Sequence, residues 1–365
     1  MNRSPLSIFK SGISGHNDPS SSFFIAEWES PSNIALVKYW GKKEGQLPAN
    51  PSLSLTLSSS VTRTFVEAVS ADKSKKHLIV NGDPDHLFVP KLQKLVKWLT
   101  SEIMVLERYS FHIKTANTFP HSTGIASSAS GISAFTLCLL SIVSKITGKD
   151  IPEEEFMRIA SFISRMGSGS ACRSVYGGFS LWGETHGLPG SSDLYAVPVN
   201  DPVHAEFLKL HDAILVVSSS PKSLSSTAGH TLMNTHPYAG VRIEQARNNI
   251  QETLKALQSG DIEKLAAISE NEALTLHSLI MTSAGGTILL EPNSLVVLKR
   301  VQQARHHGLP VFFSLDAGPN VHILYPDNSS ERVENFIREE LTQFCENGQV
   351  IFDQCGNGPI QVKTE

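Results

Sequence analysis

The sequence has few cysteines, few aromatic residues and no strong excess of charge. Four cysteines in 365 residues, none in a CxxC pair or near suitably spaced histidines, exclude a disulfide framework and favour a reducing, cytoplasmic setting. Lys and Arg total 31 against 35 Asp and Glu, a net charge of -4, so no global positive field attracts nucleic acid or an anionic membrane. Any anionic ligand must be held by a local group of cations.

Long hydrophobic runs are also lacking. The longest apolar stretch, ISAFTLCLLSIV, has about a dozen residues and is interrupted by serines, whereas a membrane span needs roughly 20. The start of the chain is polar and has no apolar stretch like that of a secretory signal, which predicts a loose arm over residues 1–22. With 40% hydrophobic and 18% charged residues the chain is typical of a globular enzyme, not of a disordered chain, collagen or a coiled coil.

The length predicts one large or two ordinary domains at roughly 150 residues each. From Phe23 to about Val69 the pattern is of short strands separated by turn residues, and residues 86–104 have helical periodicity. The later part combines buried strands with helices, which indicates helices over one face of an antiparallel sheet. We therefore predict an α+β protein with an N-terminal domain over 23–205 and a C-terminal domain over 206–365. The later elements are a strand at 213–219, helices near 238–258, 261–280 and 293–307, and a final strand, turn, strand, helix and strand.

A Gly/Ser segment, PHSTGIASSASG at 120–131, joins a predicted strand to a long apolar helix at 130–146. Backbone N–H groups in such a segment, with the helix dipole behind them, can bind phosphate oxygens. The segment lacks the lysine of a GxxxxGK[ST] loop, and a simple capped turn is the commoner explanation of such a segment taken alone. It predicts a phosphate-binding loop with that alternative open.

A second Gly/Ser turn, RMGSGSACRS, places Ser168, Gly169 and Ser170 just before Arg173. Hydroxyls, close backbone approach and a planar bidentate cation suit a carboxylate or a phosphate. The alternative is a tight turn with a surface arginine. We interpret Cys172 as a packing residue because no partner base is visible.

Three further segments contain candidate polar residues. NIALVKYWGKK brings Lys38, Tyr39 and Lys42 to the end of a strand, either as an anion clamp or as ordinary surface residues. Ser226 lies in SSTAG, where the sequence predicts a turn that leads into a helix, and on its own is an N-cap. Asp316 in LDAGPN follows an apolar strand and is either a general base or a turn-capping residue. The 14 histidines show no HExxH or HxH pattern, so the sequence names no metal ligand.

In this order, the segments resemble the mevalonate diphosphate decarboxylase family of the GHMP kinase superfamily. NIALVKYWGK, LPANPSLSLTL, GIASSAS, GSGSACRS, SSTAG and DAGPN are similar to family signatures, spread from residue 33 to 320. His230 departs from the pattern, which has methionine after SSTxG. The resemblance implies an N-terminal part like domain 2 of ribosomal protein S5, a ferredoxin-like C-terminal part and an active site between them.

The resemblance also implies a reaction and roles for residues. The family phosphorylates the 3-hydroxyl of mevalonate 5-diphosphate with MgATP and then releases phosphate and carbon dioxide, giving isopentenyl diphosphate. Asp316 would act as the base, Lys38 would lie beside it, and Arg173 would hold the C1 carboxylate. The resemblance assigns two sets of binding residues. The substrate would contact Tyr39, Lys42, Ser168, Gly169, Ser170, Arg173 and Ser226, and the ATP phosphates would contact Gly124, Ile125, Ala126, Ser127, Ser128, Ala129 and Ser130.

Cofactors and partners follow from the same resemblance. The cofactors are ATP and Mg²⁺, with Ser127 or Ser128 as the natural hydroxyl near the metal, and the family expectation is a homodimer. Neither nucleic acid nor a membrane is an expected partner. A phosphomevalonate decarboxylase, a mevalonate 3-kinase and a non-catalytic ligand-binding relative are the alternatives, the last being disfavoured because Asp316 and GSGSACRS are both present.

Overall fold

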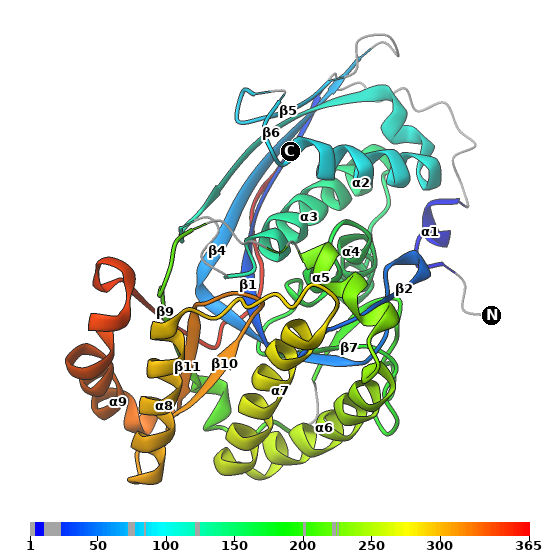
Figure 1. Ribbon diagram of the computed structural model, residues 1–365. Helices are drawn as coiled ribbons and strands as arrows, with labels where there is room; N and C mark the ends of the chain where they lie inside the picture. The colour runs from blue at the N-terminus through cyan, green and yellow to red at the C-terminus, as the bar shows by residue number, and fades with distance from the viewer. Residues whose placement is uncertain are drawn as a thin grey trace.

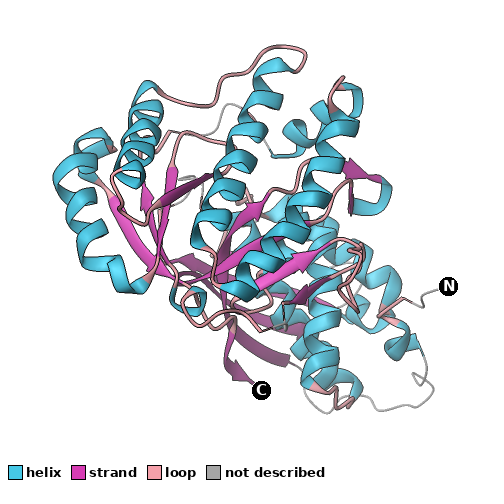
Figure 2. Ribbon diagram, turned by 90° about the horizontal axis from the view of Figure 1, so that it is seen from below, coloured by secondary structure: helices cyan, strands magenta, loops and turns pink. Residues whose placement is uncertain are grey.

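The structure is a computed structural model that describes residues 4–10, 23–71, 77–83, 85–120, 125–199, 202–220, 224 and 226–365. Two large sheets, with helices packed around them, and a small two-stranded sheet of β2 (Lys42–Lys43) and β3 (Leu47–Pro48) are present in the described part of the chain (Figures 1 and 2). The α+β class predicted from the sequence is therefore confirmed.

The larger sheet has the strand order β13-β1-β4-β6-β5, and β7 extends it from β4 with β8 beyond. Its neighbouring strands are antiparallel except β5 and β6, which run parallel. The strands are β1 (Phe23–Val37), β4 (Ser52–Ser70), β5 (Leu78–Val80), β6 (Tyr109–Asn117), β7 (Phe179–Trp182), β8 (Ala196–Pro198) and β13 (Ile360–Thr364).

The two central strands are long, 15 residues in β1 and 19 in β4, so the prediction of short strands was wrong. The turn-like residues near Pro31 are absorbed as a register shift within the β1–β4 ladder. Ser30 and Ser32 are buried there because their hydroxyls donate to Ser133 and to the Ile125 carbonyl. One half of β1 alternates between buried and half-buried positions, and the other half is buried throughout. That second half ends at the site described below.

Helices α2 (Val89–Glu102), α3 (Ser127–Thr147) and α4 (Glu153–Gly167) lie against one side of this sheet (Figure 1). Within the described residues, α3 is the helix long and apolar enough to cross a bilayer, but 83% of its most apolar window is buried inside the protein. Its apolar character therefore matches its place between the sheet and α4.

The smaller sheet is antiparallel, with the order β10-β11-β9-β12, as the sequence predicted for the C-terminal part. Helices α7 and α8 pack on β10, and α7 also reaches β1 of the larger sheet. The elements are β9 (His211–Leu215), β10 (Phe312–Leu315), β11 (Val321–Tyr325), β12 (Val350–Gln354), α6 (Ala239–Ser259), α7 (Ile262–Thr282), α8 (Pro292–His306) and α9 (Ser330–Phe336).

The ends of the chain differ from expectation. Within the predicted loose arm, the described residues 4–10 include the short helix α1 (Ser7–Lys10), and Leu6 and Phe9 are buried in the main hydrophobic cluster. These residues are not loose, because two apolar side chains are removed from water. Strand β13 pairs with β1, so it joins the larger sheet although it lies in the predicted domain 206–365.

Candidate active site

Strands β1 and β10 end at the same place and bring together two residues that are 278 positions apart. Lys38 directly follows β1 and Asp316 directly follows β10, with 3.3 Å between Lys38 Nζ and Asp316 Oδ1. The Lys38 side chain is 2% exposed and that of Asp316 is 28% exposed. Burial lowers the pKa of Lys38, and the Asp316 carboxylate opposes that shift. The predicted pairing of these two groups is thus present.

A cavity of about 540 Å³ opens beside this pair. Most of the residues that the sequence assigned to substrate and nucleotide lie on its wall. They are Lys38, Tyr39, Lys42, Ile125, Ala126, Ser127, Ser128, Ala129, Ser168, Gly169, Ser170, Arg173 and Asp316.

Of the other three assigned residues, one lies away from this wall and two fall outside the described residues. Ser130 is fully buried, and its hydroxyl is bonded to Thr62 Oγ1 and to the Ser127 carbonyl, so this side chain does not line the cavity and its assignment to the nucleotide stays a prediction. Ser130 is the fourth residue of α3 and points into the protein because that side of the helix packs on β4. Gly124 and the side chain of Ser226, which begins the short helix α5 (Ser226–Leu232), lie outside the described residues.

Arg173 ends a short 3-10 helix, Gly169–Arg173, and is 2% exposed. One guanidinium nitrogen donates to Ser52 Oγ at 2.6 Å, but Nε is buried without a hydrogen-bond partner among the described residues. The hydroxyl of Tyr39, which lines the same cavity, also lacks a hydrogen-bond partner among the described residues. Burial lowers the pKa of Arg173 and raises that of Tyr39. Unpaired buried donors are costly, so this wall is suited to an anionic ligand that would pair them.

The start of α3 forms the opposite part of the wall. Ala126 precedes the helix with φ of 28°, an unusual value for a residue with a Cβ, and the first N–H groups of a 21-residue helix follow it. Lys91 of α2 donates to Ser128 Oγ at 2.8 Å, and that hydroxyl is 3.1 Å from Ser168 Oγ. A helix N-terminus, two hydroxyls and a lysine therefore meet where the predicted nucleotide and substrate regions adjoin.

Two glycines let the loops approach one another. A Cβ on Gly169 would lie 2.8 Å from Tyr39 Cε1, so any larger residue would displace the Tyr39 ring. Gly41 has φ of 100°, and a Cβ there would lie 2.9 Å from that of Ala49. The glycines of GSGSACRS and KYWGK are thus required by packing and backbone conformation.

Several wall residues were missed by the sequence reasoning. Lys91 lies on a predicted helix and looks like an ordinary surface lysine, so no sequence signal marked it. Burial, with the Lys42 charge, lowers its pKa to about 8. His230 was noted only as a departure from the family pattern. It is 6% exposed, its Nδ1 accepts from Gly41 N–H at 3.1 Å, and burial lowers its pKa to about 3, so it is a neutral wall residue.

The interpretation of Cys172 as a packing residue can be compared with the structure. Cys172 is fully buried, and burial raises the pKa of its thiol to about 12, which agrees with packing rather than nucleophilic use. Across the described ranges, no group of three or more His, Cys, Asp or Glu side chains could hold a metal ion.

Two sheets joined by a cavity lined with cations, one carboxylate and a helix N-terminus define an α+β protein of the GHMP kinase type, built to bind anionic ligands. Comparisons agree with this class. Residues 30–196 match the family model of the diphosphomevalonate decarboxylase-like N-terminal domain, and residues 213–364 match that of the mevalonate 5-diphosphate decarboxylase C-terminal domain.

The diphosphomevalonate decarboxylase of Candida albicans is 31% identical over 324 residues, covering 85% of this chain and 86% of the relative. That of Bos taurus is 30% identical, covering 82% and 76%. The chain belongs to the diphosphomevalonate decarboxylase family. Among solved structures, mevalonate diphosphate decarboxylases of Enterococcus faecalis and Staphylococcus aureus give TM-scores of 0.79 and 0.78 at 26% and 28% identity. Each match covers 93% of this chain, with 99% of the first structure and 98% of the second. A further match, with a TM-score of 0.79 and 26% identity, covers 93% of this chain and 99% of the other and is a complex with MVAPP, AMPPCP and magnesium.

Proposed function

We propose that this protein catalyses the ATP-dependent decarboxylation of mevalonate 5-diphosphate to isopentenyl diphosphate, ADP, phosphate and carbon dioxide. The observation that carries the proposal is the Lys38–Asp316 pair at the end of two strands, facing a cavity that also contains Arg173 and the N-terminus of α3. Family membership supports the same reaction.

Asp316 is the base in this proposal. Its carboxylate is partly exposed to the cavity and contacts Lys38, which favours the ionised form of a carboxylate. It accepts the proton of the substrate 3-hydroxyl, and that oxygen attacks the γ-phosphorus of ATP. Lys38 offsets the negative charge on the attacking and leaving oxygens during phosphoryl transfer.

Arg173 holds the C1 carboxylate of the substrate. Its Nε and the Tyr39 hydroxyl are two of the buried donors that lack partners among the described residues, and Trp40 Nε1 on the same cavity is a third. After transfer, the 3-phosphate leaves with the C–O electron pair, and the C1–C2 bond electrons form the new double bond as carbon dioxide departs. Positive charge at C3 drives this step, so no electron-sink cofactor is required.

Lys42, several hydroxyl groups and the N-terminus of α3 are assigned to phosphate groups. The substrate diphosphate is assigned to Tyr39 and Lys42, with Ser168, Gly169, Ser170 and Ser226 around the same substrate. The N-terminus of α3, with Ser127 and Ser128, fits ATP phosphates because its N–H groups face the cavity wall. Magnesium would neutralise charge on the ATP phosphates, and the hydroxyl of Ser127 or Ser128 at the start of α3 would be the protein group near it.

The test is to measure ADP formation and carbon dioxide release in parallel on mevalonate, its 5-phosphate and its 5-diphosphate, each with MgATP. We expect equal amounts of both products with the diphosphate alone. ADP without carbon dioxide would identify a 3-kinase, and a preference for the monophosphate would identify a phosphomevalonate decarboxylase. No product from any of the three would refute catalysis and leave a ligand-binding relative.

We also propose a cytoplasmic homodimer whose chain divides near residue 205. The cysteines at 138, 172, 345 and 355 are free, which agrees with a reducing compartment. The two family models meet between residues 196 and 213, which supports the division. Sedimentation velocity at micromolar concentration tests the dimer, and a single monomer boundary would contradict it.

A further inference from the structure

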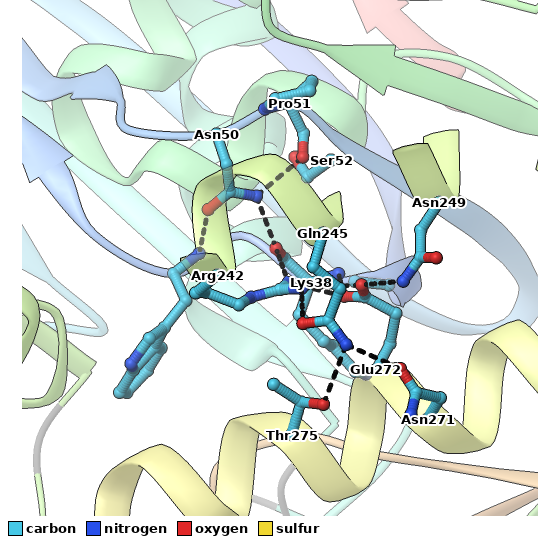
Figure 3. A network of polar contacts seen from close by, with 12 residues as sticks. Lys38, Asn50, Pro51, Ser52, Arg242, Gln245, Asn249, Asn271, Glu272 and Thr275 are labelled. Carbon is cyan, nitrogen blue, oxygen red and sulfur yellow. Dashed lines mark hydrogen bonds and ion pairs between the residues drawn. The ribbon is translucent and has the colours of Figure 1, made fainter. Parts of the chain in front are cut away.

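The main chain of Lys38 is held by side chains rather than by a neighbouring strand. The last paired residue of β1 in its ladder with β4 is Val37. Beyond it, the Lys38 N–H donates to Glu272 Oε2 at 2.8 Å. The Lys38 carbonyl accepts from Asn50 Nδ2 at 2.9 Å and from Arg242 at 3.1 Å. Figure 3 shows these side chains converging on Lys38 from different elements.

Glu272 and Arg242 form a buried ion pair between α7 and α6. Their side chains are 0% and 1% exposed, and the guanidinium binds both carboxylate oxygens, at 2.6 and 2.5 Å. Asn249 donates to the same carboxylate at 2.6 Å. Desolvating such a pair is costly, and packed apolar residues are often at least as stabilising. Stability therefore does not account for its presence, whereas holding the Lys38 main chain does.

The same helix also contacts Asp316. His277 Nε2–H donates to the Asp316 carbonyl oxygen at 3.0 Å, and His277 is 2% exposed. Glu272 and His277 are five positions apart on α7, a rise of about 7.5 Å along the helix axis. One rigid element thus binds the main chain of both partners of the Lys38–Asp316 pair, which come from different sheets.

We propose that α7 sets the separation of Lys38 and Asp316, with Glu272 and His277 as positioning residues. The inference rests on the proposed function, since it assumes that Lys38 and Asp316 carry the reaction. The 3.3 Å contact between them is longer than the roughly 2.7–2.9 Å usual for an ammonium–carboxylate hydrogen bond, so a small further displacement breaks it.

The main test replaces the ion pair as a unit, Arg242→Met with Glu272→Met, which leaves no unpaired buried charge. We expect a folded protein with the KM for ATP within about twofold of the unchanged chain. Its kcat should fall about 100-fold, the cost of a misplacement of about 1 Å. A folded double variant with kcat within about twofold of the unchanged protein would overturn the proposal.

The matched control is the other ion pair of α7, Glu270 with Arg305 of α8. This pair contacts neither Lys38 nor Asp316. The control variant is Glu270→Gln with Arg305→Met. The glutamine side chain keeps an oxygen that can accept the hydrogen bond that the Phe313 N–H donates to Glu270. Its kcat should stay unchanged. An equal loss in the control would show general disturbance of α7 and would also overturn the proposal.

His277 gives a second measurement that does not depend on the ion pair. His277→Leu removes the donor to the Asp316 carbonyl, while His277→Gln retains an N–H donor. Positioning requires a loss of kcat in the first and rescue in the second, and equal kcat values would refute it. Asp316→Asn is assayed in parallel. Turnover in that variant would refute the proposed role of Asp316. If it is inactive while the double variant Arg242→Met with Glu272→Met is fully active, only the positioning role is refuted.

Discussion

Deprotonation of Lys91 should lower kcat/KM above about pH 8. Its ammonium group is half-buried near Lys42, and these two causes lower its pKa from 10.5 to about 8. The group is charged below that value, so its attraction for phosphate oxygens is present at pH 7 and is lost as the pH rises through 8. About nine-tenths of the lysine is charged at pH 7 and about one-tenth at pH 9, a tenfold change.

The quantity to measure is kcat/KM for each ligand, from pH 6.5 to 9.5, because it reports groups of the free enzyme. We expect a fall of about tenfold between pH 7 and pH 9. In Lys91→Arg this alkaline fall should move well above pH 8, because a guanidinium stays protonated. The profile of kcat should bend at higher pH than that of kcat/KM, since bound phosphate favours the charged lysine.

The control is Lys97→Arg, a lysine exposed on the same helix. It should leave the profile unchanged. An alkaline limb that stays near pH 8 in Lys91→Arg would refute the assignment and transfer the titration to another lysine. Lys38 and Lys42 are the other described lining lysines, and burial lowers the pKa of both.

Three other substitutions follow from the geometry. Asp316→Asn should abolish ADP and carbon dioxide formation together while a fluorescent ATP analogue still binds; substantial turnover would contradict the base assignment. Arg173→Lys should lower kcat/KM at least about tenfold, because a point charge replaces a planar fork, and an undiminished value would place the carboxylate elsewhere. Asp353→Ala should lower the free energy of unfolding by about 3 kcal/mol in a denaturant titration, because three successive N–H groups at 58–60 lose their acceptor. A change below about 1 kcal/mol would show that water replaces the carboxylate.

The sequence predicted those parts of the structure that local patterns determine. Helices expected at 238–258, 261–280 and 293–307 occur at Ala239–Ser259, Ile262–Thr282 and Pro292–His306, because each has a buried apolar stripe. The motifs KYWGK and GSGSACRS each place several wall residues within a few positions, so each motif carries its own part of the cavity.

Features that depend on distant residues were not predicted. The turn residues around Pro31 do not end β1, because their polar groups are paired by Ser133 and by the Ile125 carbonyl, far along the chain. The pairing of β13 with β1 joins the two ends of the sequence, and the five residues of β13 are exposed or half-exposed, so the strand has no buried face that reveals it. Lys91 and the Glu272–Arg242 pair likewise make their contacts only when elements that are distant in the sequence pack together.

The charges around the cavity explain how a chain with a net charge of -4 can bind polyanions. Among the described lining residues, Lys38, Lys42, Lys91 and Arg173 face one carboxylate, Asp316. Burial lowers the pKa of each of these cations, and in the case of Lys91 the neighbouring Lys42 adds to the shift. Their charged forms are therefore disfavoured without an anion and favoured with one. The cations that are costly to bury are those that supply affinity for phosphate and carboxylate groups.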